Sequence, residues 1–136
     1  MKNINELPNK ISVFPLSNFI IFPNTSVPLN IFEPRYIQMV DDSMKSNRII
    51  GMIQPKNQNN NRPELYSIGC AGKITSFDET EDGRYLIVIK GISRFKILNE
   101  MENKKPYREC EVSFLPFNQD MIKNETKIEF SDLKLI

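Results

Sequence analysis

Apolar and polar positions alternate in a way that predicts several short strands and one helix. Three apolar segments come first, at residues 11–16, 18–23 and 26–32. Each is stopped or interrupted by proline, which has no N–H to donate to a sheet ladder. We therefore expect Pro15, Pro23 and Pro28 to lie at sheet edges, strand ends or turns.

At Phe32 the apolar period changes to four, which predicts an amphipathic helix over about residues 33–46. The apolar face of this helix consists of Phe32, Tyr36, Val40 and Met44, with Ile37 beside them. Pro34 is compatible with a first helical turn, where backbone N–H groups have no intrahelical partner. Glu33 suits the positive end of the helix dipole.

The chain that follows has the pattern of a sheet. We expect a buried strand at 48–55, a polar asparagine-rich loop at 56–64, and strands at 65–79 and 85–100. Asp82–Gly83 between the last two strands is a strong hairpin signal.

The second strand of this hairpin has two features of its own. Successive residues from Tyr85 to Ile89 are apolar, which predicts a strand that is buried on both faces or that lines a small barrel. After Gly91 the apolar residues move to the other set of alternate positions, which indicates a bulge or bend in the strand. A last strand at 107–116 alternates apolar Cys110, Val112 and Phe114 with polar residues.

These elements predict one β-dominated α+β domain of about six short strands and one helix, arranged as a barrel. We divide the chain into an N-terminal arm at 1–10, the β domain at 11–116 and a tail at 117–136. The tail ends on Leu135–Ile136 without a capping signal, so we expect a further element to follow it.

Composition narrows the possible functions. With 18 basic and 17 acidic residues in 136, the net charge of +1 creates no general attraction for nucleic acid or anionic membranes. The apolar runs are much shorter than a membrane-spanning helix, and the N-terminal residues lack the apolar core of a signal peptide. We expect a cytoplasmic protein.

The sequence offers no catalytic constellation. It contains no histidine, which removes histidine-based nucleophile pairs, metal sites and proton shuttles. Cys70 and Cys110 lie in separate apolar strands and are predicted to be free buried thiols. The glycines at 69–74 lack phosphate-loop spacing, and the carboxylates at 78–82 fit a solvated turn. We expect no catalytic residue, metal or cofactor.

One basic stretch leaves an alternative open. Lys90, Arg94 and Lys96 follow one another along a predicted strand near Tyr85 and Phe95. Basic and aromatic side chains on a sheet can bind single-stranded RNA. Solvent-facing basic residues on a strand are the simpler interpretation, so nucleic acid remains the less favoured partner.

Several motifs occur in a fixed order between residues 11 and 115. They are Pro15–Leu16, Phe19–Pro23, Pro28–Leu29, "IFEPRY" at 31–36, "RIIGMIQP" at 48–55, "LYSIGCAGKITSF" at 65–77 and "GISRFKI" at 91–97. In this order they resemble the amino-terminal domain of Lon proteases and its stand-alone relatives. The "IFEPRY" form is more like the stand-alone proteins than the full proteases.

The resemblance implies a PUA-like pseudo-barrel, normally followed by a helical subdomain, that contacts unfolded or degron-bearing polypeptides. It implies a non-catalytic protein-binding domain in protein quality control, with polypeptide substrates or a protease or chaperone as partners and self-association as a further option. The alternatives are an RNA-binding PUA-like module, or the N-terminal targeting fragment of a full ATP-dependent Lon protease.

We expect binding through exposed apolar surface of the proline-rich segment and the helix edge, with Arg94 as a further candidate. The candidate residues are Phe19, Ile20, Phe22, Arg35, Tyr36 and Arg94. For Tyr36, packing in the core is the favoured alternative.

Overall fold

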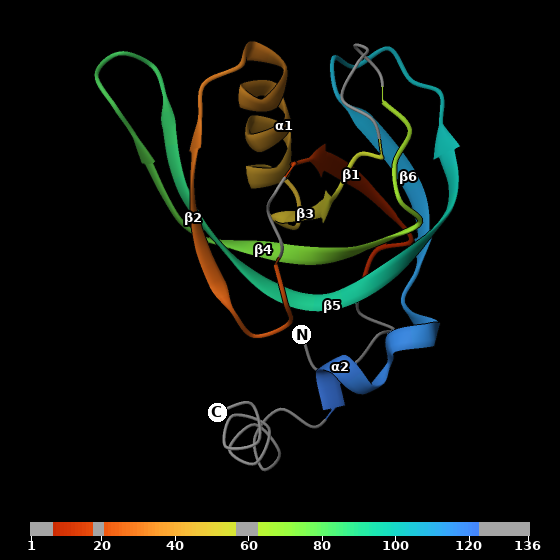
Figure 1. The fold of residues 1–136 in the computed structure, drawn as a ribbon. Helices are drawn as coiled ribbons and strands as arrows, with labels where there is room; N and C mark the ends of the chain where they lie inside the picture. The colour runs from red at the N-terminus through yellow and green to blue at the C-terminus, as the bar shows by residue number, and fades with distance from the viewer. Residues whose placement is uncertain (1–6, 18–20, 57–62, 123–136) are drawn as a thin grey trace.

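Six strands and two α-helices make up the computed structural model, which describes residues 7–17, 21–56 and 63–122. In chain order the elements are β1 (Lys10–Pro15), β2 (Ser26–Ile31), α1 (Pro34–Met44), β3 (Ile49–Ile53), β4 (Ile68–Glu79), β5 (Tyr85–Met101), β6 (Arg108–Ser113), the 3₁₀ helix η2 (Leu115–Phe117) and α2 (Gln119–Ile122). Figure 1 shows α1 on one side of the curved sheet and α2 on the other. The expected β-dominated α+β class is confirmed.

The sheet closes partly on itself because β5 is long enough to pair at both ends. The strand order is β2-β5-β4-β3-β1-β6, and β5 pairs with β6 as well. The first part of β5 pairs with β2 and β4, and its last part with β6. The β1–β3 pair is parallel and the others are antiparallel. β2 remains at the edge, where Pro28 was expected.

Irregular pairing bends β5 where the sequence indicated. Ala71 pairs with Ser93 and Gly72 with Gly91, so Ile92 has no cross-strand partner. An extra residue of this kind bends a strand and increases its twist. The predicted bulge after Gly91 is confirmed.

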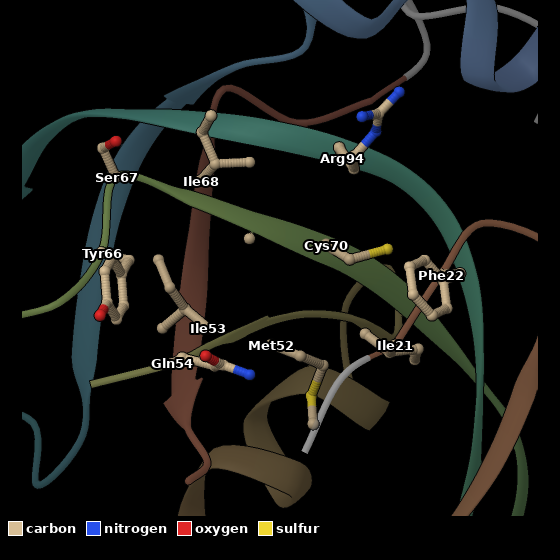
Figure 2. Close-up of a pocket in the computed structure, with 11 residues that line it drawn as sticks. Ile21, Phe22, Met52, Ile53, Gln54, Tyr66, Ser67, Ile68, Cys70 and Arg94 are labelled. Carbon is tan, nitrogen blue, oxygen red and sulfur yellow. The ribbon is translucent and has the colours of Figure 1, made fainter. Parts of the chain in front are cut away.

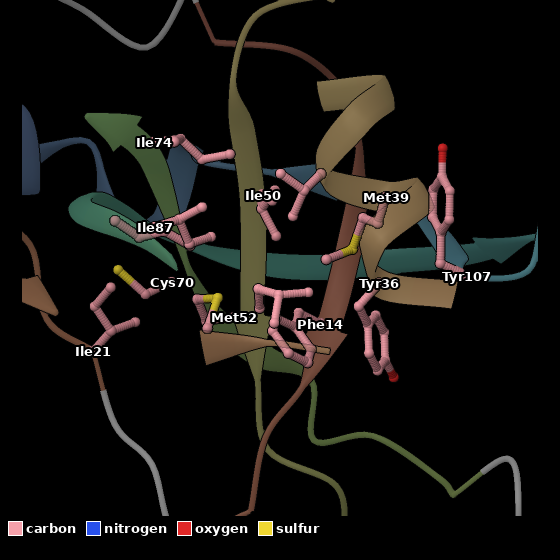
Figure 3. Packing of buried hydrophobic residues seen from close by; sticks show 13 residues of the cluster. Phe14, Ile21, Tyr36, Met39, Ile50, Met52, Cys70, Ile74, Ile87 and Tyr107 are labelled. Atoms are coloured by element: carbon pink, nitrogen blue, oxygen red, sulfur yellow. The ribbon is translucent and has the colours of Figure 1, made fainter. Parts of the chain in front are cut away.

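Two apolar cores lie on opposite faces of the sheet. The inner cluster consists of Leu7, Ile11, Val13, Ile49, Ile53, Ala71, Phe95, Cys110, Val112 and Phe114. The helix-side cluster, drawn in Figure 3, consists of Phe14, Ile21, Ile31, Tyr36, Met39, Val40, Ile50, Met52, Cys70, Ile74, Ile87, Ile89 and Tyr107. Alternate residues of β3 enter the two clusters, which is why this strand is buried along its whole length.

The predicted burial of Phe32 is wrong, and of the two alternatives for residues 85–89 the structure excludes burial on both faces. Glu33 is the extended N-cap residue of α1, so Phe32 precedes the helix and is 66% exposed, while Met39 is fully buried. In β5, Ile87 and Ile89 face the helix-side cluster, but Leu86 points the other way and is 40% exposed. Neighbouring residues of a strand face opposite sides, and only one side of this part of β5 is covered.

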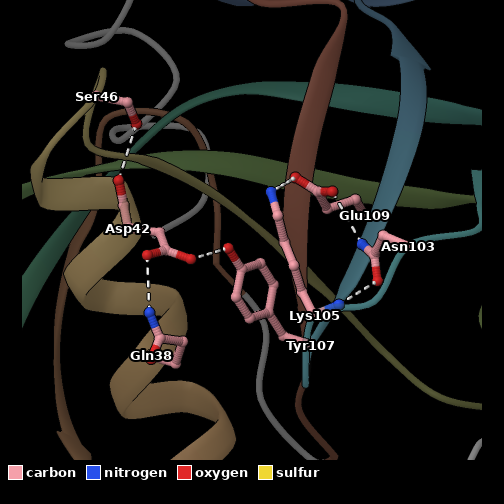
Figure 4. A network of polar contacts seen from close by, with 7 residues as sticks. All are labelled: Gln38, Asp42, Ser46, Asn103, Lys105, Tyr107 and Glu109. Carbon is pink, nitrogen blue, oxygen red and sulfur yellow. Dashed lines mark hydrogen bonds and ion pairs between the residues drawn. The ribbon is translucent and has the colours of Figure 1, made fainter.

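Polar contacts fasten α1 to the sheet. The Tyr107 hydroxyl donates a hydrogen bond to Asp42, whose carboxylate also accepts one from Gln38 Nε2 at 2.9 Å (Figure 4). The Tyr85 hydroxyl donates to Asp41 Oδ1 at 2.7 Å. The hydrogen bond from Tyr107 holds the pKa of Asp42 below its ordinary value of 3.8, because it favours the ionised form. Two tyrosines thus anchor adjacent carboxylates of one helix.

Tyr107→Phe tests this attachment. Its free energy of unfolding at pH 7 should fall by about 1–2 kcal/mol, since a hydrogen bond to a charged acceptor is lost. A carboxylate with a lowered folded pKa stabilises the fold above its unfolded pKa, and this contribution disappears as the pH falls through the folded pKa. The loss of stability between pH 6 and pH 3 should therefore be smaller in Tyr107→Phe than in the wild type.

Urea unfolding followed by circular dichroism measures both quantities. Tyr66→Phe is the matched control, because among the described residues the Tyr66 hydroxyl has no hydrogen bond. An unchanged pH dependence in Tyr107→Phe, or an equal loss of stability in the control, would contradict the assignment.

Candidate functional site

An apolar cavity of about 400 Å³ opens beside the helix-side cluster, to which its lining residues Ile21, Met52 and Cys70 belong. Its walls come from the segment before β2, the end of β3, the start of β4 and one residue of β5. The lining residues are Ile21, Phe22, Met52, Ile53, Gln54, Tyr66, Ser67, Ile68, Gly69, Cys70 and Arg94. We call it the apolar pocket. In Figure 2, Tyr66 and Phe22 stand at opposite ends and Arg94 lies at the rim.

Large apolar side chains are exposed around this pocket. Phe22 is 58% exposed, and Tyr66 and Ile68 are each 50% exposed. Single exposed apolar residues are ordinary, but several around one concave site are typical of a binding surface. The volume also falls in the range of ligand-binding clefts.

A turn docked on β5 holds Phe22 in place. The Asn24 N–H donates to the Gly91 carbonyl, and the Gly91 N–H donates to the Thr25 carbonyl, both at 2.8 Å. The Thr25 hydroxyl donates to the Phe22 carbonyl at 2.7 Å. Residue 91 must be glycine for this approach, because a Cβ there would lie 2.1 Å from the Phe22 carbonyl oxygen.

Arg94 joins the rim of the pocket to α2. Its Nε and one terminal nitrogen donate to the Asp120 carboxylate at 3.0 and 2.9 Å, and its backbone N–H donates at 2.9 Å. Its guanidinium also stacks 4.6 Å from the centre of the Phe117 ring. The hydrogen bonds to Asp120 raise the pKa of Arg94 above its ordinary value. The Asp120 side chain is buried, whereas that of Arg94 is half exposed.

The structure brings Phe22 and Arg94 together at the apolar pocket and places two other candidates elsewhere. Tyr36 is buried in the helix-side cluster, with its ring centre 4.3 Å from that of Phe14. Arg35 lies over the Tyr36 ring and forms an ion pair with Glu33 at 3.2 Å. The remaining two candidates, Phe19 and Ile20, lie outside the described residues.

Sequence reasoning missed the opposite wall of the pocket. Tyr66 and Ile68 were treated as members of a strand, although β4 begins only at Ile68 and the preceding residues are irregular. The available signal was a group of apolar residues directly after a polar loop and before Gly69. Cys70 contributes a buried thiol whose pKa is raised to about 12 by burial, so it stays protonated and acts as an apolar wall.

Other kinds of site find no support in the residues that the structure describes. Phe95 is fully buried inside the barrel, so it is unavailable for stacking on a base beside Arg94 and Lys96. Within the described ranges, no group of three histidine, cysteine or acidic residues could hold a metal ion. None of the helices in those ranges has the length and apolar character needed to cross a membrane.

Comparison with known proteins identifies related sequences. Residues 10–134 match the family model of the ATP-dependent protease La (LON) substrate-binding domain. The Lon protease of Cytophaga hutchinsonii is 29% identical over 133 residues, which cover 95% of this chain and 16% of that protein. The Lon protease of Flavobacterium johnsoniae is 27% identical over 108 residues, covering 77% of this chain and 13% of that protein. The chain therefore spans a small part of these relatives.

Solved structures share the fold. The Lon N-terminal domain protein from Xanthomonas campestris aligns with a TM-score of 0.64 at 23% identity, over 77% of this chain and 59% of that one. The N-terminal domain of the Mycobacterium avium complex Lon protease aligns with a TM-score of 0.61 at 18% identity, over 77% of this chain and 54% of that one.

Gly91→Ala tests how the pocket wall is held. The added methyl group would collide with the backbone of Phe22, which cannot yield as a flexible side chain would. We expect the free energy of unfolding to fall by about 2 kcal/mol, as for other overpacked sites, and the 22–25 turn to be cleaved faster by protease. Lys96→Ala, on the same strand with an exposed side chain, is the control. Wild-type stability in Gly91→Ala would refute the close approach.

Proposed function

The chain belongs to the family of LON substrate-binding domains, and on this premise we propose that it binds polypeptide segments in the apolar pocket. The family model that matches is that of the substrate-binding domain, so the chain is a non-catalytic domain. ATP hydrolysis and peptide-bond cleavage would be carried out by other domains or other polypeptides.

The observation that carries the proposal is the ring of exposed apolar side chains around a preformed cavity. Phe22, Tyr66 and Ile68 would each lose contact with water on covering an apolar side chain, at about 25 cal/mol for each Å² of apolar surface removed. A folded protein keeps most of its large apolar side chains buried, whereas an unfolded segment exposes them. Such a pocket therefore favours unfolded polypeptide over native protein.

Arg94 adds a polar contact at the rim. Its guanidinium has five N–H donors, and two side-chain nitrogens already donate to Asp120. The half-exposed side chain can direct a remaining donor to a carbonyl group of a bound segment. Because Asp120 and Phe117 hold the guanidinium, this contact would require little ordering on binding.

We place this activity in the cytoplasm, in protein quality control, with the polypeptide delivered to an ATP-dependent protease. Self-association would be compatible with this role. No observation favours the RNA-binding alternative, since Phe95 is inside the barrel and Asp120 compensates the charge of Arg94.

Phe22→Ala tests the proposal with a fluorescently labelled, unstructured peptide rich in leucine and phenylalanine. We expect affinity to fall about tenfold, because burying one large apolar side chain contributes about 1.5–3 kcal/mol. The matched control is Phe32→Ala, at an exposed phenylalanine that does not line the pocket. Fluorescence anisotropy at low and high salt gives the affinities, which should change little with salt.

Equal affinities of the two alanine variants would contradict binding at this pocket. Binding of single-stranded RNA that weakens steeply with salt, together with no binding of the peptide, would favour the nucleic-acid alternative.

A further inference from the structure

A second and smaller cavity, of about 220 Å³, has a different character from the apolar pocket. Its lining residues are Asn24, Lys73, Thr75, Lys90, Gly91, Ile92, Asp120 and Met121. We propose that this basic pocket binds a carboxylate group of the polypeptide, from an aspartate or glutamate side chain or from a C-terminus. The inference rests on the proposed function, because it assigns a chemical preference to the same class of ligand.

Two lysines are the main evidence. Lys73 of β4 and Lys90 of β5 are direct cross-strand partners, and both are exposed. Like charges placed opposite each other on a sheet are destabilising. Within the described residues neither lysine has an ion-pair partner. An anion held between the two ammonium groups would relieve their repulsion.

Asp120 also lines the basic pocket, but its charge is already compensated. Its two carboxylate oxygens accept three hydrogen bonds from the side chain and backbone of Arg94. The Asp120 side chain is 5% exposed, so it presents little surface to a ligand. The pocket therefore offers two positive charges against one neutralised carboxylate.

The remaining polar groups and the overall charge favour a carboxylate. Asn24 and Thr75 add neutral polar groups, and a lysine ammonium adapts its three donors to an oxygen ligand. The net charge of the chain is only +1, which creates no general attraction for nucleic acid. Carboxylates are the anionic groups that an unmodified polypeptide carries at neutral pH.

The two pockets are neighbours that share no lining residue. Phe22 of the apolar pocket and Asn24 of the basic pocket belong to the same turn. Arg94 lines the first pocket and its ion-pair partner Asp120 lines the second. One segment with an apolar residue and a nearby acidic residue could therefore reach both, and acidic groups near an apolar residue would strengthen binding.

The test compares two labelled peptides with the same apolar core, one flanked by glutamates and the other by glutamines at the same positions. The wild type should bind the glutamate peptide more tightly. In Lys73→Gln/Lys90→Gln, affinity for the glutamate peptide should fall about fivefold, as expected for two exposed charge contacts, and affinity for the glutamine peptide should not change.

Lys45→Gln/Lys104→Gln is the control, because it changes the net charge equally at exposed lysines outside both pockets. It should leave both affinities unchanged. Removing the like-charge pair should not lower the unfolding temperature, so retained thermal stability separates lost binding from misfolding.

Several outcomes would overturn the inference. Equal affinities of the wild type for the two peptides would contradict a carboxylate site at Lys73 and Lys90. Equal losses of affinity in the two lysine double variants would contradict it as well. A further outcome would assign the pocket to free phosphate: inorganic phosphate binds the wild type but not Lys73→Gln/Lys90→Gln, and the wild type shows no preference for the glutamate peptide.

The proposed function has a separate readout in the same experiment. If the glutamine peptide binds the wild type and Phe22→Ala lowers this affinity, binding at the apolar pocket is supported, whatever the result for the lysine variants. If neither peptide binds, both proposals fall.

Discussion

The barrel closes around one side chain, Phe95, and the rest of the structure depends on the space left for its ring. Phe95 is fully buried and lies edge-on to Phe114, with ring centres 6.3 Å apart. A Cβ at Gly51 would lie 3.0 Å from the Phe95 ring, and one at Gly69 would lie 2.7 Å from it. Two neighbouring strands thus lack side chains where the ring needs room, because a close-packed interior tolerates neither a void nor an overlap.

Closure around Phe95 has consequences along the whole of β5. The bulge at Ile92 bends the strand, so that its first part supports β2 and α1 while its last part joins β6. The same bend leaves Gly91 open to the turn that carries Phe22. The apolar pocket therefore arises where regular pairing is interrupted, on a scaffold that is otherwise hydrogen-bonded.

Two charged contacts in this domain position its helices. The bond from Tyr107 to Asp42 holds α1, and the ion pair of Arg94 with Asp120 holds α2. These contacts suit a domain that presents a surface and carries out no chemistry of its own. Against this background, the opposed pair of Lys73 and Lys90 stands out, since it adds repulsion to the fold and fastens nothing within the described residues.

The sequence by itself determined the main elements: about six strands, the hairpin at Asp82–Gly83, the bulge after Gly91 and a helix over about residues 33–46. The spacing of apolar residues, the positions of proline and the turn-forming residues each depend on a few neighbouring residues, so the sequence alone shows them. It also pointed to Phe22 and Arg94, although not to the cavity between them. The sequence also favoured burial of Tyr36, which the structure confirms, but only the tertiary structure showed that Phe32 is exposed. The pocket walls and the lysine pair depend on strand register and on closure around Phe95, which join residues far apart in the chain.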